Sequence, residues 1–156
     1  MTAAGVGRIL VVGYGNPLCG DDGAGPAVVN HAAVDPALSG AEVRTQHQLT
    51  PELALDIAAA SLVILVDAGT NATPGDVVVE RVDPAADEAA AWSHHVDPAG
   101  LVLLTRELFG VAPPVFTVCV GAASMEVGDG LSPAVDAAIP AAARAVVALV
   151  EAHRHA

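Results

Sequence analysis

The sequence predicts a three-layer α/β domain in which a mostly parallel, twisted sheet of about five strands lies between helices. Segments with strand character alternate with segments with helix character along the whole chain, as crossover connections in a parallel sheet require. Residues 9–12 and 62–66 are short, wholly apolar runs, which is typical of strands buried on both faces. The chain has 156 residues, no internal repeat and no linker, so residues 1–156 are expected to form a single domain.

The first half of the chain contains three expected strands and two expected helices. The strands are residues 9–12, 42–46 and 62–66. A glycine-rich turn follows the first strand, which we expect to be central, and residues 27–34 are expected to form a helix entered near Pro26. Thr50 is expected to cap a second helix, with Pro51 in its first turn and Ser61 at its end.

The second half continues the alternation. Residues 75–82 are expected to form a strand at a sheet edge, because Glu80 and Arg81 interrupt its apolar run. Residues 83–92 are rich in alanine and acids, which favours a loop or a weak helix. A helix, a strand and a final helix capped by Ser132 are then expected at residues 98–108, 115–120 and 132–153.

The composition is both acidic and apolar. There are 18 acidic residues against 6 basic ones, all arginine, which gives a formal net charge of -12. Nucleic-acid binding needs a basic face, so a nucleic-acid partner is not expected. No apolar run reaches the roughly 18 residues of a membrane span. Residues 1–7 lack the basic and then apolar pattern of a signal peptide, so we expect a cytoplasmic protein without a membrane partner.

The two cysteines, Cys19 and Cys119, do not form a C-x-x-C pair and are too few for a disulfide framework. Both are expected to be reduced, and Cys119 is expected to be a core residue because it lies in an apolar strand. Cys19 lies in the turn after the first strand. The neighbouring carboxylates of Asp21 and Asp22 disfavour the thiolate that a nucleophile needs, which argues against a cysteine peptidase built from Cys19 and His94.

The glycine-rich turn invites comparison with a dinucleotide-binding loop, but the comparison fails. The G-x-G-x-x-G pattern needs a third glycine where this chain has Leu18. Asp21 and Asp22 would also place negative charge where a pyrophosphate has to lie. The loop therefore fits a cation or a cationic group better than a nucleotide.

A third carboxylate, Asp67, directly follows the apolar run of residues 62–66. If this strand is a parallel neighbour of the first, then Asp21, Asp22 and Asp67 converge at one sheet edge, where ligands bind in open α/β sheets. The alternative is that Asp67 only caps a turn. Its position at a strand end favours the functional interpretation.

His94 and His95 stand just before the expected helix of residues 98–108. A histidine combined with two or three carboxylates forms a site that suits a borderline divalent ion such as nickel or zinc. An exposed loop histidine explains the same residues equally well, so the residues alone leave the two interpretations open.

A long motif resembles the N-terminal signature of the hydrogenase maturation endopeptidases. The pattern G-x-G-N-x-L-x-x-D-[DE]-x-x-G stands here as Gly13, Gly15, Asn16, Leu18, Asp21, Asp22 and Gly25. Residues 93–98 are similar to the family's Ser/Thr-His-x-hydrophobic-(Asp/Ser)-Pro pattern, and residues 130–135 resemble the segment ahead of its last helix. The resemblance covers nearly the whole chain and implies a phosphorylase/hydrolase-like fold.

The resemblance also implies which residues act. The two metal-contacting acids of the family fall on Asp22 and Asp67, and its histidine falls on His94. These three are therefore the expected catalytic and metal-contacting residues.

Three further residues are expected to bind the substrate, namely Asn16, Asp21 and His47. His47 marks a departure from the family, because many members have a Gly-Gly-Thr-type turn where this chain has residues 46–51. The departure puts His47 near the same sheet edge. It indicates either a subgroup with a different hydrogenase partner or a fourth polar group in the site.

The activity implied by the resemblance is removal of a C-terminal extension from the precursor of a nickel–iron hydrogenase large subunit, once nickel is in place. Nickel would come with the substrate, no resident organic cofactor is expected, and we expect the enzyme to be a monomer. Two alternatives stay open. One is a hydrolase with a resident metal, although the chain lacks an H-E-x-x-H motif. The other is a nickel-binding assembly factor without catalysis.

Overall fold

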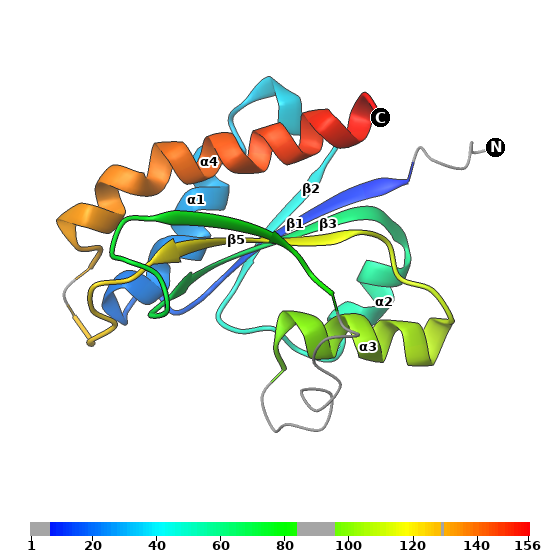
Figure 1. The fold of residues 1–156 in the computed structure, drawn as a ribbon, viewed down its shortest axis with the longest axis horizontal. Coiled ribbons are helices and arrows are strands. Elements are labelled where there is room, and N and C mark those ends of the chain that lie inside the picture. The colour runs from blue at the N-terminus through cyan, green and yellow to red at the C-terminus, as the bar shows by residue number, and fades with distance from the viewer. Residues whose placement is uncertain (1–6, 84–95, 129) are drawn as a thin grey trace.

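The computed structural model describes residues 7–83, 96–128 and 130–156. Within these residues, five strands form one mixed sheet in the order β2-β1-β3-β5-β4 (Figure 1). The strands are β1 (Arg8–Tyr14), β2 (Glu42–Gln46), β3 (Ala60–Gly69), β4 (Val77–Arg81) and β5 (Val115–Gly121). All neighbouring strands are parallel except β4, which runs antiparallel to β5. The predicted mostly parallel sheet is therefore confirmed.

Helices cover both faces of this sheet, which gives the three predicted layers (Figure 1). Helices α1 (Ala24–Ala32) and α4 (Pro133–Arg154) lie on one face and enclose an apolar cluster that includes Val11 and Ile64. Helices α2 (Leu53–Ala58) and α3 (Pro98–Phe109) lie on the other face, over a second cluster that includes Leu10 and Leu65. Two short 3₁₀ helices, η1 (Gly20–Gly23) and η2 (Pro36–Leu38), complete the described elements.

Strand β3 lies at the centre of the sheet because residues 62–66 are all apolar and at most 1% exposed. A strand with partners on both sides and helices on both faces has no position that favours a polar side chain. The first strand was expected to be the central one, but the central strand is β3 and the first strand is its neighbour. β1 is an interior strand between β2 and β3.

Helix α2 has different boundaries from those predicted. It begins at Leu53, because Thr50 and Pro51 first form a turn in which the Leu53 amide donates to the Thr50 carbonyl oxygen at 3.1 Å. No side chain caps α2, so the predicted Thr50 cap is wrong. Ser61 does not end the helix but lies in β3, where its hydroxyl donates to the carbonyl oxygen of Gly7 at 2.8 Å.

Helix α1 begins at Ala24, three residues earlier than predicted, and packs directly on the sheet backbone. A Cβ atom at Gly25 would lie 2.6 and 2.9 Å from the backbone oxygen and nitrogen of Tyr14, and it would also meet the carbonyl oxygen of Val66. Gly13 of β1 faces the same helix, since a Cβ there would lie 2.7 Å from the carbonyl carbon of Gly25. The missing side chains let the start of α1 lie against the ends of β1 and β3.

The remaining elements agree with the predictions to within a few residues. β4 lies at the sheet edge, as predicted, and pairs with β5. Of residues 83–92, predicted as a loop or weak helix, only Asp83 is described, and the rest lie outside the described residues. Ser132 caps α4, as predicted, by accepting a hydrogen bond from the Val135 amide.

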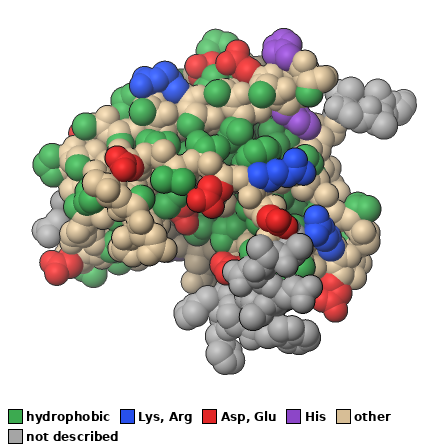
Figure 2. Space-filling view, viewed as in Figure 1, with side chains coloured by type: hydrophobic (Ala, Val, Ile, Leu, Met, Phe, Trp, Pro, Cys, Tyr) green, Lys and Arg blue, Asp and Glu red, His purple; other side chains and the backbone are tan. Residues whose placement is uncertain are grey.

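Helix α4 is the one helix in the described part of the chain that is long and apolar enough to cross a membrane, judged by length and composition alone. Its buried side chains, which include Val135, Val146 and Val150, pack with α1 and the sheet in the first cluster, as the core helix of a soluble protein does. Acidic side chains are scattered over the molecular face seen in Figure 2 and outnumber the arginines there, in keeping with the net charge of -12.

Gly25→Ala is expected to lower the free energy of unfolding by about 3 kcal/mol or more. The start of α1 and the backbone of β1 and β3 would have to move apart to admit the methyl group. Gly110→Ala is the control, since nothing lies within 4 Å of a Cβ there. Its backbone φ of +83° alone should cost about 1–2 kcal/mol. Urea unfolding measures both. Equal losses would contradict the close packing of α1 on the sheet.

Candidate active site

Two acidic side chains meet where β1 and β3 end. The two strands are parallel neighbours, with Gly13 opposite Val66, so their carboxyl ends lie at the same edge of the sheet. Asp67 directly follows Val66, and Asp22 lies in η1, the turn that follows β1. Burial raises the pKa of Asp67, and the nearby charge of Asp22 raises it further. The structure thus brings Asp22 and Asp67 together at one edge, as the strand pattern predicts.

The half-buried Asp67 carboxylate is held by two neutral donors. The Tyr14 hydroxyl donates to Asp67 Oδ2 at 2.7 Å. Cys119 is the partner of Asp67 in the register of β3 and β5, which places its thiol beside the same carboxylate as a second donor. Both hydrogen bonds lower the pKa of Asp67, but burial outweighs them and the pKa remains above its ordinary value. Asp67 therefore accepts a proton more readily than an ordinary aspartate does.

The two donors stay protonated near neutral pH. Burial, followed by the charge of Asp67, raises the pKa of the Tyr14 hydroxyl far above its usual range. The same two effects raise the pKa of the Cys119 thiol to about 12. Since the thiolate is the reactive form of cysteine, Cys119 is placed as a hydrogen-bond donor and not as a nucleophile.

Asp22 is half-buried and held differently. Its Oδ2 accepts a hydrogen bond from the Asn16 backbone amide at 2.7 Å. Within the residues that the structure describes, Oδ1 has no hydrogen-bond partner. The Asn16 side chain shapes the same loop, because its Oδ1 accepts from the Leu18 amide at 3.0 Å. The loop thus leaves one oxygen of Asp22 available to a ligand.

Asp21, next to Asp22 in the chain, is fully buried. Its two oxygens accept four hydrogen bonds, from the backbone amides of Ala123, Ser124 and Ser132 at 2.6–3.1 Å and from the Ser132 hydroxyl at 2.9 Å. Desolvation alone raises the pKa of Asp21, but these hydrogen bonds, led by that from the Ser132 amide, bring it below its ordinary value. The predicted substrate contact of Asp21 therefore has no support in the structure, which makes Asp21 an anchor of the loops.

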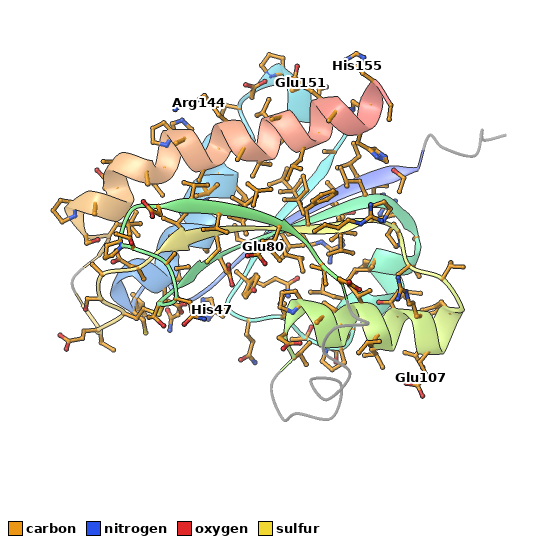
Figure 3. The ribbon with its side chains drawn as sticks, in the orientation of Figure 1. His47, Glu80, Glu107, Arg144, Glu151 and His155 are labelled. Atoms are coloured by element: carbon orange, nitrogen blue, oxygen red, sulfur yellow. The ribbon has the colours of Figure 1, made fainter. Side chains whose placement is uncertain are left out.

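Two clefts flank the pair of Asp22 and Asp67. The first has a volume of about 470 Å³ and is lined by Tyr14, Asp22, the exposed His47 and residues 48–51. The second, of about 420 Å³, is lined by residues that include Asp67, Glu80, Thr117 and Cys119. Figure 3 labels His47 and Glu80, which both lie on the side of the sheet covered by α2 and α3. The predicted His47 thus shares a cleft with Asp22.

The same fold occurs in solved structures of known proteins. No protein-family model matches the chain, and no curated protein sequence matches it. The hydrogenase maturating endopeptidase HybD from E. coli is 27% identical, with a TM-score of 0.74 over 92% of each chain. The hydrogenase 2 maturation peptidase from Thaumarchaeota archaeon SCGC_AB-539-E09 is also 27% identical, with a TM-score of 0.70 over 92% of this chain and 98% of that one. In sequence and fold the chain is similar to the hydrogenase maturation endopeptidases.

A third neighbour has the same fold at lower identity. The [NiFe] hydrogenase maturation protease HybD from Thermococcus kodakarensis is 20% identical, with a TM-score of 0.69 over 92% of this chain and 99% of that one. The fold of this chain therefore matches nearly the whole of that structure. The sequence resemblance and the α/β fold are both confirmed by these structures.

Only part of the predicted metal site lies in the residues that the structure describes. Asp22 and Asp67 are two of its three predicted residues, whereas His94, like His95, lies outside the described residues. In the described ranges, no group of three His, Cys, Asp or Glu side chains is placed to hold a metal ion. The described site therefore offers a divalent ion two carboxylates, and the roles of Asp22, Asp67 and His94 stay predictions.

Sequence reasoning missed two residues of the site. Tyr14 was not singled out, and Cys119 was expected in the core, which is wrong because it is half-buried and lines the second cleft. The sequence alone does not indicate a role for Cys119, because its position beside Asp67 depends on the order of the strands, which places β5 next to β3. Cys19, the other thiol, is free and half-buried in the loop that precedes η1.

Asp21→Asn is expected to lower the free energy of unfolding by about 3 kcal/mol at neutral pH, because an amide nitrogen would face backbone donors in a buried site. Asp76→Asn, an exposed aspartate before β4, is the control and should stay within about 0.5 kcal/mol. Denaturant unfolding measures both variants.

The stabilisation by Asp21 also depends on pH with a defined sign. Its folded-state pKa is lowered, so the contribution is complete above the unfolded value of about 3.9 and is lost as pH falls through the folded value. The difference between wild type and Asp21→Asn should therefore shrink in acid. A difference that grows as the pH falls would contradict this role.

Proposed function

We propose that this endopeptidase removes the C-terminal extension from the precursor of a nickel–iron hydrogenase large subunit after nickel insertion, and that it recognises the nickel bound to that substrate. The observation that carries the proposal is the convergence of Asp22 and Asp67 at one sheet edge, in the fold shared with hydrogenase maturation endopeptidases. His94 is proposed as the third residue that contacts the metal.

The charge of the site fits a cationic substrate group. Two carboxylates lie close together, and the charge of Asp22 acts on Asp67 without a neighbouring arginine among the ion pairs of the described residues. A divalent ion brought by the substrate would offset this repulsion. Carboxylate oxygen and imidazole nitrogen also suit nickel as ligands. In this proposal the metal belongs to the substrate, and the enzyme recognises a substrate as ready for cleavage by the presence of that metal.

Two routes for hydrolysis are compatible with these residues. In one, the substrate's metal polarises the scissile carbonyl group or activates a water molecule. In the other, a carboxylate accepts the proton of the attacking water. Asp67 suits the second route, because burial raises its pKa and makes its carboxylate a stronger base than usual. The two clefts on either side of the pair leave space for the peptide that crosses it.

The proposal includes the setting in which the enzyme works. The precursor is its partner, and we expect it to act as a monomer in the cytoplasm. Asn16 is proposed to act through the loop that it shapes around Asp22, and His47 is proposed to contact the substrate from the first cleft.

Asp22→Asn, Asp67→Asn and His94→Ala are each expected to reduce processing by at least about 100-fold while the fold persists, because metal-contacting or proton-accepting groups are lost. Asp22→Glu should retain part of the activity, since it keeps a carboxylate and moves it by only one methylene group. Intact-mass analysis of a nickel-loaded precursor measures the cleavage. Cys19→Ala is the control and should process normally, and its inactivity would revive the cysteine-peptidase alternative.

Metal dependence is expected to follow the substrate. A nickel-free precursor should stay uncut even when the enzyme has been incubated with nickel, because the few ligands of the enzyme hold the ion only together with those of the substrate. Metal analysis of the purified enzyme should accordingly find less than one tightly held ion per chain. Cleavage of a metal-free precursor by metal-free enzyme would contradict nickel recognition, and a stoichiometric resident metal would favour a metallohydrolase.

A further inference from the structure

Two side chains on different strands converge on Asp67 at the end of the sheet. Tyr14 is the last residue of β1 and donates to Asp67 Oδ2 at 2.7 Å. Cys119 lies on β5, directly beside Asp67 in the register of the parallel pair. We infer that Tyr14 and Cys119 are positioning residues, which together fix the orientation of the Asp67 carboxylate in which it meets the substrate.

Both donors are themselves fixed by the fold. Tyr14 is half-buried and packs against the second apolar cluster, so its hydroxyl has little freedom to move. The Cys119 side chain has one rotatable bond before its sulfur, and its position is set by backbone pairing between β3 and β5. Gly69 maintains this arrangement, because a Cβ atom there would lie 2.9 Å from Cys119 Sγ. Asp67 is thus held by rigid elements and not by a loop.

Asp67 requires such support because its surroundings are unfavourable to a carboxylate. It is half-buried, and the neighbouring charge of Asp22 repels it. The described residues give it hydrogen bonds but no ion pair. Without both donors, the carboxylate is expected to rotate away from Asp22 toward the second cleft, where solvent stabilises the charge.

The two donors act through Asp67 and not on the substrate directly. Each directs its proton toward Asp67, so neither is placed to act as a base or a nucleophile on the substrate. A misplaced carboxylate loses the alignment that catalysis needs, while the rest of the substrate-binding surface stays intact. Loss of either donor should therefore lower kcat and leave KM nearly unchanged.

The activity test uses matched variants and rests on the proposed function. Cys119→Ala and Tyr14→Phe should each lower kcat about tenfold at constant KM. Cys119→Ser should stay within about threefold of wild type, because a hydroxyl donates as a thiol does. Serine and alanine remove similar volume, so a purely structural role would impair both equally. Equal loss in the two variants, or a change in KM alone, would overturn the inference.

A spectroscopic test needs no precursor and therefore separates this inference from the proposed function. The chain has two cysteines, so Cys19→Ala leaves Cys119 as its single thiol. In that background, Asp67→Ala should shift the S–H stretching band of Cys119 to higher frequency, because the thiol loses its acceptor. An unchanged band would overturn the inference even if the precursor is processed. A shifted band would support it even if wild-type enzyme leaves the precursor uncut.

Discussion

The buried carboxylate of Asp21 is the constraint on which the geometry of this end of the molecule depends. Its four hydrogen bonds join η1 to the segment after β5 and to Ser132, the N-cap residue of α4. Ser132 also accepts from the Val135 amide, so the start of α4 is tied to the same point. A charged group without solvent is stable only when it is fully hydrogen-bonded, which forces these loops to close around it.

This constraint explains how two adjacent aspartates acquire opposite roles. Asp21 and Asp22 are consecutive residues of a 3₁₀ turn, in which side chains point about 120° apart. With Asp21 pointing into the protein, Asp22 points in another direction, and its charge acts on Asp67 at the end of β3. The anchored loop also holds Asn16, whose amide binds Asp22 Oδ2 at 2.7 Å. The buried residue thus sets the direction of its more exposed neighbour.

Sequence reasoning recovers the parts of this fold that depend on local pattern. The apolar run of residues 62–66, the edge character of residues 75–82 and the Ser132 cap are each determined by nearby residues. The different roles of Asp21 and Asp22 are not, because both have the same chemistry and differ only in which one meets residues about 100 positions away. The contact of Cys119 with Asp67 likewise depends on β5 inserting between β3 and β4, which no local pattern encodes.

The electrostatics of the site point to a partner that completes it. Neutral donors hold the Asp67 carboxylate, and no arginine of the described ranges forms an ion pair with Asp22 or Asp67. Adding a cation at Asp22 and Asp67 would relieve both the repulsion between them and the burial penalty on Asp67. Under the proposed function, the paired charges of Asp22 and Asp67 would favour a metal-loaded substrate over a metal-free one. The proposed selectivity for a mature substrate would then require no conformational change in the enzyme, because it would follow from the two carboxylates that the fold brings together.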